Sequence, residues 1–460
     1  MKMDLDLNTI KNVHFVGIGG IGVSAVARMM LHEGKNVTGQ DMQGGEIVDE
    51  LTKIGININI GQSYEGIPEE ADLVVYTVAI ETYDKELFDK LKSQNNFAIR
   101  SYPEMLGIIS EDKYTIAVCG THGKTTTTGM IAEILGNNGN DPTVIVGSLL
   151  KDKNGNRTNF IGGHPNHTDG QDKRGYFVVE ACEYRRSFLN INPNILVITN
   201  IDEDHLDYYK NIEDIKSAFH EMVMKVPRDG YIICNPNDKN IADVIKDTNA
   251  KIINWEEYFN NDLKLKIPGF HNKKDAAAAV AAAETIGISK EKAEKYVSSF
   301  PGTWRRFEFK GKLSSGILVY DDYAHHPLEI TSTLQGFREL YPKEETWKVT
   351  VVFQPHLFSR TKLLLNDFAQ SFGDADEVLI LPIYYAREVD DGTISSEILS
   401  NEINRVEGQA GKNAYKSKAF SDFESLENYL GALLPSMGNK DIIVTMGAGE
   451  AFKIGDFLLR

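Results

Sequence analysis

Residues 114–135, YTIAVCGTHGKTTTTGMIAEIL, decide the fold of the central part of this chain. Residues 116–119 are a short apolar run of the kind that is buried in a parallel strand, and the run ends at Gly120. After the segment Thr-His-Gly-Lys-Thr, apolar residues with helical spacing begin at Met130 and Ile131. The stretch therefore predicts a strand, a glycine turn and the start of a helix in direct succession.

This arrangement suits the phosphates of a nucleotide. Gly120 and Gly123 allow backbone N–H groups to surround an anion, and the helix N-terminus adds partial positive charge. Lys124 can reach the outer phosphates, and the Thr125 hydroxyl can hold magnesium. The loop is a shortened variant, with Val118 where the usual pattern has glycine, so a glycine turn with a threonine-rich helix cap is the alternative. The stretch predicts an ATP or GTP site.

Composition limits the kind of protein. With 460 residues, the chain is long enough for about three domains. The formal net charge of -17 argues against nucleic acid or an anionic membrane as a partner. The N-terminus is acidic where a secretory signal needs an apolar core, and no run is long enough to span a bilayer, so we expect a cytoplasmic protein. Three scattered cysteines fit reduced thiols.

A second glycine turn lies near the N-terminus. It follows a predicted strand at residues 13–16 and contains Gly17, Gly19, Gly20 and Gly22, with an acid, Asp41, about twenty residues further on. Taken alone, this pattern is typical of an NAD-dependent dehydrogenase. The glycines indicate close approach of some phosphate-bearing ligand without saying which one, and a turn without a ligand is the third possibility.

Two further apolar strands of the central region end in acids. Residues 176–179 lead into Glu180, and residues 195–198 lead into an acidic segment that contains His205. Ligands of open α/β sheets bind at the carboxyl ends of strands, so we expect these side chains to face Lys124. Beside a triphosphate they would suit one or two magnesium ions. Acids that merely cap strands in solvent are the alternative.

The last third of the chain predicts another α/β pattern. Strands are expected at residues 317–320, 349–353, 378–381 and 442–446. Polar clusters follow predicted strands or segments: Arg305 with Arg306, residues 321–327, and His356 with Arg360. Arginine suits carboxylate or phosphate and histidine can move a proton, although surface salt bridges or core histidines would give the same pattern. Together with the phosphate loop, these clusters favour an ATP-dependent ligase or kinase.

The chain resembles the Mur ligase family, the ATP-dependent amide-bond ligases of peptidoglycan precursor synthesis, over nearly its whole length. The motifs that carry the resemblance stand here as HFVGIGGIGVSAVA, GTHGKTTTT, EACEY, TNIDEDHLDYY, PGFHN, RRFEFKG, DDYAHHPLE and PHLFSRT. The resemblance implies an α/β fold with three domains: a Rossmann-like domain at residues 1–108 for a UDP-sugar, a central P-loop ATPase with a mostly parallel sheet at residues 109–303, and a Rossmann-like C-terminal domain at residues 304–460.

The resemblance also implies a reaction. L-alanine would be joined to the carboxylate of UDP-N-acetylmuramate through an acyl phosphate, with ATP and Mg²⁺ as cofactors and the protein a monomer or weak homodimer. The implied catalytic residues are Lys124, Glu180, His205, Arg306, His325 and Arg360. The implied metal ligands are Thr125, Glu180 and His205.

The resemblance implies two sets of binding residues. Those implied for the nucleotide are Gly120, Thr121, His122, Gly123, Lys124, Thr125, Thr126, His271, Asn272, Asp322 and Tyr323. Those implied for the sugar substrate are Gly17, Gly19, Gly20, Gly22, Asp41 and His326, so the first glycine turn would hold uridine diphosphate and not NAD.

Two positions depart from the family pattern. Cys182 replaces the usual acidic residue between Ala181 and Glu183, and Asp275 stands where related enzymes usually have an asparagine toward adenine. Two other functions are compatible with the motifs. One is the ligase that recycles a murein tripeptide onto the same UDP-sugar, and the other is a nucleotide-gated binding protein without chemistry.

Overall fold

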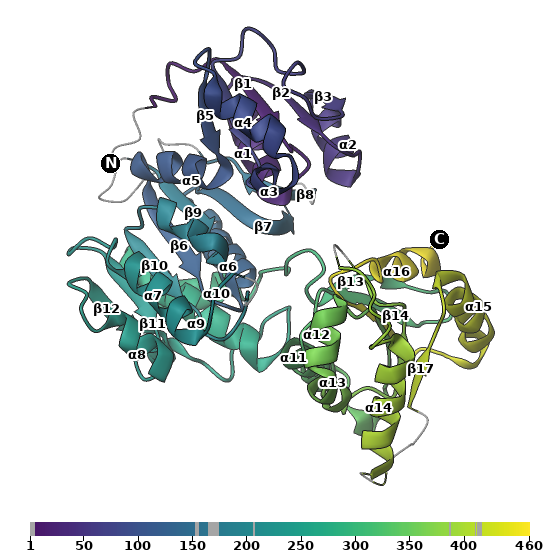
Figure 1. The fold of residues 1–460 in the computed structure, drawn as a ribbon. Coiled ribbons are helices and arrows are strands. Elements are labelled where there is room, and N and C mark those ends of the chain that lie inside the picture. Colours follow the sequence, from purple (N-terminus) through teal and green to yellow (C-terminus); the bar gives the residue numbers. More distant parts are fainter. Residues whose placement is uncertain are drawn as a thin grey trace. The chain divides into compact units, whose positions relative to one another are not determined.

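The computed structural model describes residues 5–151, 156–163, 174–205, 208–385, 388–409, 411 and 416–460. The chain forms two compact units. The first comprises Met1–Leu265 and Lys273–Pro301, and the second comprises Lys266–Asn272 and Gly302–Arg460. The first unit contains two sheets and the second contains one, and parallel pairing dominates all three (Figure 1). The predicted α/β fold class is confirmed.

The first sheet is wholly parallel, in the order β3-β2-β1-β4-β5. Its strands are β1 Asn12–Val16, β2 Asn36–Asp41, β3 Asn57–Ile60, β4 Leu73–Tyr76 and β5 Ala98–Ser101. Its helices are α1 Ile21–His32, α2 Glu46–Lys53, α3 Ile80–Tyr83 and α4 Lys85–Ser93. The strand order reverses between β1 and β4, and such a switch point opens a crevice at the carboxyl ends of the strands. The glycine turn after β1 lies at this edge.

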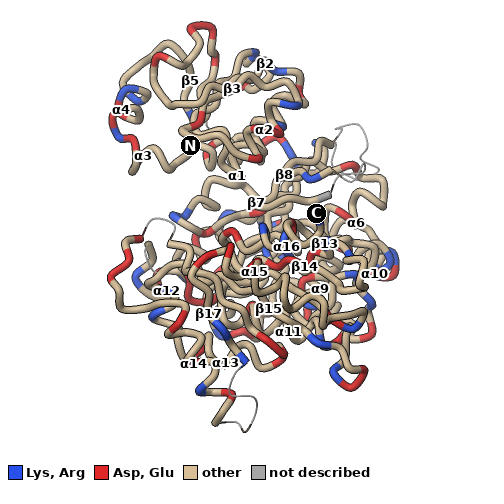
Figure 2. The backbone as a smooth tube through the Cα atoms, turned by 90° about the vertical axis from the view of Figure 1, so that its right-hand side faces the viewer, with Lys and Arg blue, Asp and Glu red and all other residues tan. Residues whose placement is uncertain are grey.

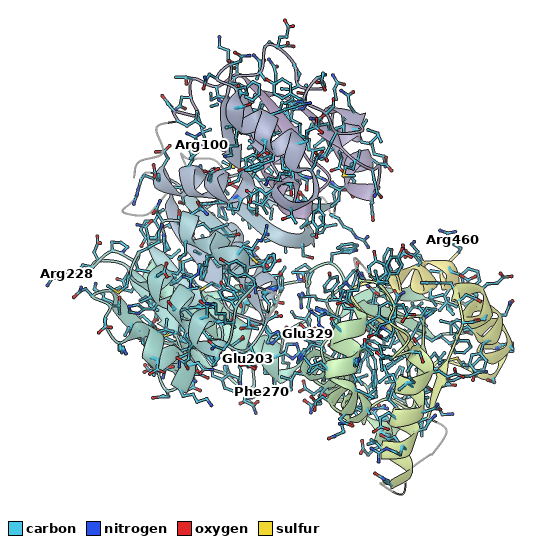
Figure 3. The ribbon with its side chains drawn as sticks, in the orientation of Figure 1. Arg100, Glu203, Arg228, Phe270, Glu329 and Arg460 are labelled. Carbon is cyan, nitrogen blue, oxygen red and sulfur yellow. The ribbon has the colours of Figure 1, made fainter. Side chains whose placement is uncertain are left out.

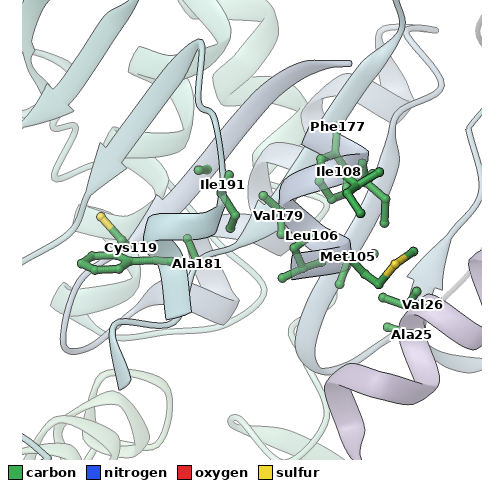
Figure 4. Packing of buried hydrophobic residues seen from close by; sticks show 14 of the residues in the cluster. Ala25, Val26, Met105, Leu106, Ile108, Cys119, Phe177, Val179, Ala181 and Ile191 are labelled. Carbon is green, nitrogen blue, oxygen red and sulfur yellow. The ribbon is translucent and has the colours of Figure 1, made fainter. Parts of the chain in front are cut away.

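Helix α5, Tyr102–Glu111, connects the first sheet to the second. A capping box between Ser101 and Glu104 starts the helix. Its Met105 and Leu106 belong to one buried cluster with Val26 of α1 and with residues of the second sheet (Figure 4). The hydrophobic core of the first unit is therefore continuous between its two sheets.

The second sheet has the order β12-β11-β10-β6-β9-β7-β8 and is parallel except for the β7–β8 pair. Its strands are β6 Tyr114–Cys119, β7 Thr143–Lys151, β8 Arg157–Ile161, β9 Tyr176–Glu180, β10 Ile195–Ile198, β11 Tyr231–Cys234 and β12 Lys251–Asn254. The associated helices are α6 Lys124–Asn137, η1 Tyr184–Asn190, α7 Ile212–Val223, α8 Lys239–Ile245, η2 Trp255–Tyr258, α9 Phe270–Thr285 and α10 Lys290–Val297. Because β6 lies between β9 and β10, the carboxyl ends of these three strands are neighbours.

The third sheet has the order β13-β14-β18-β15-β16-β17, and only the β13–β14 pair is antiparallel among its described strands. The strands are β13 Glu308–Lys312, β14 Leu318–Asp322, β15 Lys348–Phe353, β16 Glu377–Ile380, β17 Ser417–Ala419 and β18 Asp441–Met446. The helices are α11 Pro327–Leu340, η3 Lys343–Glu345, α12 Phe358–Leu363, α13 Leu365–Ser371, α14 Ser396–Gln409, α15 Phe423–Leu433, η4 Leu434–Ser436 and α16 Phe452–Leu458. Buried aliphatic and aromatic side chains pack on both faces of this sheet.

Charged residues of both signs are spread over the chain (Figure 2). Acidic residues outnumber basic ones, 66 to 49. Among the residues that the structure describes, every helix is too short or too polar to cross a bilayer.

We expect the stability of the first unit to depend on pH through His14 in β1. Burial lowers the pKa of His14 to about 4, while its Nδ1 lies 2.8 Å from the Thr38 hydroxyl of β2. The unfolded chain takes up a proton near pH 6.5 but the folded protein does not, so lowering the pH below 6.5 favours unfolding. The free energy of unfolding should fall by up to about 3 kcal/mol between pH 7.5 and pH 4 from this group. Urea unfolding across this range measures it, and His14→Val should flatten the pH dependence; an unchanged slope would refute the assignment.

Candidate active site

The first part of the site is the loop between β6 and α6. It has the predicted order of strand, glycine turn and helix. Gly120 has φ +134°, and a Cβ atom there would lie 2.0 Å from Thr199 Oγ1. Gly123 has φ +80° and precedes the first residue of α6, Lys124. Both positions therefore need glycine, and the turn leads directly into the N-terminus of α6, where a phosphate can bind.

The segment after β10 holds this loop in place. Thr121 N donates to Asn200 O at 3.1 Å, and His122 N donates to Asn200 Oδ1 at 2.9 Å. The Thr199 hydroxyl donates to His122 O. Thr199 and Asn200 support the loop and were not predicted, although both belong to the motif TNIDEDHLDYY.

The side chain of Lys124 folds back and donates hydrogen bonds to its own loop. Its Nζ donates to Gly120 O, to Thr121 O at 3.1 Å and to Glu183 Oε1 at 3.0 Å. Burial by itself lowers the pKa of the Lys124 ammonium, but the nearby acidic groups, with Glu183 contributing most, outweigh it and raise the pKa. Lys124 is therefore charged at neutral pH and carries the cation that a phosphate needs.

Glu180, at the end of β9, lies against the first turn of α6 as predicted from the strand ends. The Thr125 hydroxyl is 3.1 Å and 3.0 Å from its two carboxylate oxygens, and Gly147 N donates to Oε2 at 2.7 Å. A hydroxyl and a carboxylate at this distance are oxygen ligands that Mg²⁺ accepts, with water completing the octahedron. Within the described ranges, no group of three or more His, Cys, Asp and Glu side chains is arranged to hold a metal ion. The residues fit an ion that is shared with a substrate phosphate.

His205 lies near the same loop, in a backbone conformation that is unusual outside glycine. Its φ is +54°, its ring lies 4.7 Å from the Tyr184 ring, and its Nε2 is 3.8 Å from Glu183 Oε1. Strained residues of this kind persist only where their surroundings fix them, and they concentrate at functional sites. The structure thus brings His205 close to Lys124 through a shared neighbour.

That shared neighbour, Glu183, was missed as a functional residue. Its side chain is 3% exposed and faces both Lys124 and His205. The only signal in the sequence was a second acid three residues after Glu180. The Tyr209 hydroxyl and Arg186 N both donate to the backbone carbonyl of Glu183 and so fix its position.

Asp275 also lies against the phosphate loop. A Cβ atom on Gly123 would be 2.4 Å from Asp275 Oδ1, so this carboxylate of α9 packs directly on the glycine turn. The carboxyl group is buried. The aspartate that replaces the family's usual asparagine at this position therefore contacts the phosphate loop itself.

The N-terminal glycine turn is hydrogen-bonded to Asp41, the acid at the end of β2. Gly19 N donates to Asp41 Oδ2 at 2.8 Å, and Gly17 has φ +74°. Helix α1 begins after Gly20 without a side-chain cap. A Cβ atom on Gly22 would lie 2.5 Å from the Tyr102 ring. The N–H groups of Gly17, Gly19 and Gly20 all donate within the protein, to Gln40 O, Asp41 Oδ2 and Gly17 O. A phosphate at the switch point of the first sheet would therefore meet the N-terminus of α1.

Five of the residues predicted for the ATP site lie in the second unit, before α11 in the chain: His271, Asn272, Arg306, Asp322 and Tyr323. Burial and the charge of Arg306 lower the pKa of His271 to about 4. Asn272 donates to Pro268 O, and the Arg306 guanidinium lies 6.0 Å from the centre of the Tyr323 ring.

Asp322 is held by the protein backbone of this unit. It accepts from Phe307 N at 2.7 Å and from Ala324 N at 2.8 Å, and burial raises its pKa to about 6. These hydrogen bonds fix the side chain of Asp322 within its own turn.

A histidine and arginine cluster lies at the start of α11 and α12. His325 Nδ1 is 3.3 Å from Glu329 Oε2, which caps α11 (Figure 3 labels Glu329), and the His325 ring is 6.1 Å from that of His356. His326 is the N-cap residue of α11. Burial lowers the pKa of His325, and it lowers that of His356 to about 4. Both imidazoles are thus neutral at pH 7 and can accept a proton.

Two polar atoms of this cluster are buried and have no hydrogen-bond partner among the described residues. They are His356 Nδ1 and Arg360 Nη1. Buried polar atoms of this kind call for a partner that the folded chain does not supply. The cluster is therefore suited to an anionic or polar ligand.

Three family models match consecutive parts of the chain. The Mur ligase family catalytic domain matches residues 12–114, the Mur ligase middle domain matches residues 118–278, and the Mur ligase glutamate ligase domain matches residues 305–449. Together they cover most of the chain.

Similar proteins of full length are known. The UDP-N-acetylmuramate–L-alanine ligase of Clostridium acetobutylicum is 41% identical over an alignment that covers 100% of both chains. Among solved structures, the UDP-N-acetylmuramate–alanine ligase of Thermotoga maritima is 27% identical with a TM-score of 0.76, and the murein peptide ligase of Psychrobacter arcticus is 25% identical with a TM-score of 0.64. Each of these alignments covers 98% of both chains.

Proposed function

Because the chain belongs to the Mur ligase family, we infer that it joins L-alanine to the carboxylate of UDP-N-acetylmuramate with hydrolysis of ATP. The observation that carries this conclusion is a lysine beside a hydroxyl–carboxylate pair at the start of α6, in a chain similar over its full length to a ligase of that name. The chain is an ATP-dependent amide-bond ligase of peptidoglycan precursor synthesis.

A carboxylate is a poor electrophile, so the reaction needs an activated acid. The muramate carboxylate attacks the γ-phosphorus of ATP, the bond to the β-phosphate oxygen breaks, and an acyl phosphate and ADP result. The amine of L-alanine then attacks the acyl carbon, loses a proton, and phosphate leaves. In this scheme the turn at Gly120 and Gly123 binds the phosphates through backbone N–H groups, and Lys124 stabilises negative charge on the transferred group.

Thr125 is proposed to hold a first Mg²⁺, and Glu180 with His205 a second metal ion. The support is the short contact between the Thr125 hydroxyl and Glu180, together with the position of His205 beside Glu183. When bound, the ions would neutralise charge on the phosphate oxygens and orient them. Thr125 and Glu180 would supply oxygen ligands, and His205 would supply an imidazole nitrogen.

The remaining predicted residues keep their proposed roles. Gly17, Gly19, Gly20, Gly22 and Asp41 would bind the uridine diphosphate part of the substrate, and His326 its sugar side. His271, Asn272, Asp322 and Tyr323 would contact the nucleoside of ATP, and Arg306 its γ-phosphate. His325 and Arg360 would face the muramate or the amino acid. The three domains would comprise residues 1–108, 109–303 and 304–460.

The recycling of a murein tripeptide is the second candidate, because the murein peptide ligase of Psychrobacter arcticus aligns over 98% of this chain. The higher identity to the L-alanine ligase of Clostridium acetobutylicum favours the alanine reaction. A dehydrogenase would use the first glycine turn but would leave Lys124 and Glu180 without a role.

We expect phosphate release to require L-alanine. Purified protein with ATP, Mg²⁺ and UDP-N-acetylmuramate should release phosphate and form the amide on addition of L-alanine, and it should turn over at least about tenfold more slowly with the tripeptide L-alanyl-γ-D-glutamyl-diaminopimelate. Coupled phosphate detection and mass spectrometry of the product measure both. Turnover with the tripeptide alone would instead establish the recycling reaction.

A further inference from the structure

The ion pair between Lys124 and Glu183 occupies the place where a phosphate loop needs a free cation. Lys124 Nζ is 3.0 Å from Glu183 Oε1 and also donates to two carbonyl groups of its own loop, so all of its contacts are made within the protein. A triphosphate that recruits Lys124 must take the place of these partners.

Glu183 would then lose its cation. Its side chain is 3% exposed, and its second oxygen, Oε2, is buried and has no hydrogen-bond partner among the described residues. The remaining imidazole neighbour, His205 Nε2, is 3.8 Å from Oε1, beyond hydrogen-bond range. A buried carboxylate without a partner is strongly destabilising, and it repels a polyanion in a region of low dielectric constant.

Glu180 adds a second carboxylate to the same site, 3.0 Å from the Thr125 hydroxyl. Asp275 Oδ1 packs on Gly123 of the same turn, so metal-free nucleotide would meet three carboxylates and the Lys124 ammonium ion. A divalent cation that enters with the phosphates supplies the missing positive charge, and one of its water ligands can donate a hydrogen bond to Glu183 Oε2.

We propose that Glu183 is a positioning residue whose ion pair with Lys124 makes the loop accept a nucleoside triphosphate only together with its divalent cation. This inference rests on the proposed ATP site. Glu183 also fixes where the ammonium group lies, because Tyr209 and Arg186 hold its own backbone carbonyl. Removal of its charge should therefore ease metal-free binding and still impair turnover.

The test measures binding of a fluorescent ATP analogue by the full-length protein in excess EDTA and in excess MgCl₂. Glu183→Gln should tighten metal-free binding at least about tenfold, change metal-loaded binding less than about threefold, and lower kcat at least about tenfold with little change in KM. The control is Glu221→Gln. It makes the same charge change on α7, where Glu221 pairs with Arg186, and should leave both dissociation constants as they are.

A purely structural role for Glu183 would weaken binding equally with and without metal, and that result, or two unchanged dissociation constants, would overturn the proposal. If Glu183→Gln does not fold, the double variant Lys124→Met/Glu183→Gln removes both buried charges. It should bind metal-free nucleotide more tightly than Lys124→Met does; equal or weaker binding would also overturn the proposal. Absence of any nucleotide binding by the unaltered protein in MgCl₂ would instead refute the ATP site itself.

Discussion

Lys124→Ala should abolish ligation, with a fall in kcat/KM of at least about thousandfold. Lys124 is the residue of the β6–α6 turn that brings a positive charge to the phosphates, and its pKa is raised by its acidic neighbours, so the charge is present throughout the neutral range. The loss should appear mainly in kcat, because charge on the transferred phosphoryl group develops in the transition state. Amide formation from UDP-N-acetylmuramate and L-alanine measures it.

Lys216→Ala is the matched control. Lys216 lies on α7 of the same unit and pairs with Asp243 at 2.6 Å and Glu213 at 3.1 Å, outside the phosphate loop. Its loss should leave kcat/KM within about twofold. Because Lys124→Ala leaves Glu183 without its ion pair, circular dichroism and thermal unfolding must accompany the assay. A folded Lys124→Ala protein with full activity would disprove the proposed role of the loop.

The loop could be predicted from sequence because its structure is local. The apolar run, the glycines and the helical spacing lie within about twenty consecutive residues, and each fixes its own backbone conformation. Glu180 and His205 could be predicted from the rule that strand ends gather at one edge of the sheet. Glu180 and His205 lie near the loop because β6, the strand before the loop, pairs with β9 on one side and with β10 on the other.

Glu183, Thr199 and Asn200 could not be identified in the same way. Their roles depend on contacts between segments about sixty to eighty residues apart, such as Lys124 with Glu183 and His122 with Asn200. In sequence, Glu183 is one acid among several after a strand, and only the fold determines that it is buried. The antiparallel β7–β8 pair was also missed; it contacts α1, a helix that lies more than a hundred residues earlier in the chain.

Arg305 and Arg306 of the second unit are another case in which the sequence does not show which side chain is buried. Sequence reasoning treated Arg305 and Arg306 as one cluster for carboxylate or phosphate, with a salt bridge as the alternative. Both guanidinium groups lie near the Tyr323 ring, at 5.2 Å for Arg305 and 6.0 Å for Arg306. The structure separates them by burial: Arg305 is buried and its Nε donates to Asp321 Oδ2 at 2.7 Å, whereas Arg306 is half-buried. Arg305 therefore makes a salt bridge, but a buried one and not the surface salt bridge that was the alternative.

Arg305→Met should destabilise the second unit by about 3–5 kcal/mol. Besides Asp321, the guanidinium donates to Gly449 O at 3.0 Å and to Gly447 O at 2.6 Å, so it joins β14 to the turn after β18. Without it, Asp321 keeps the Thr445 hydroxyl as a partner but is left as a buried carboxylate without a counter-ion. Urea unfolding followed by tryptophan fluorescence measures the change, because Trp304 lies next to the substituted residue and within the same unit.

Two comparisons separate loss of the ion pair from loss of packing. Burial already raises the pKa of Asp321, and removal of Arg305 should raise it further, so the carboxyl group of the variant can be neutral at low pH. The difference in stability between Arg305→Met and the unaltered protein should therefore be smaller at pH 5 than at pH 8. The double variant Arg305→Met/Asp321→Asn should recover at least about half of the loss, since neither buried charge remains. If the double variant is as unstable as Arg305→Met at both pH values, the packing of the arginine side chain, and not its charge, holds this end of the sheet together.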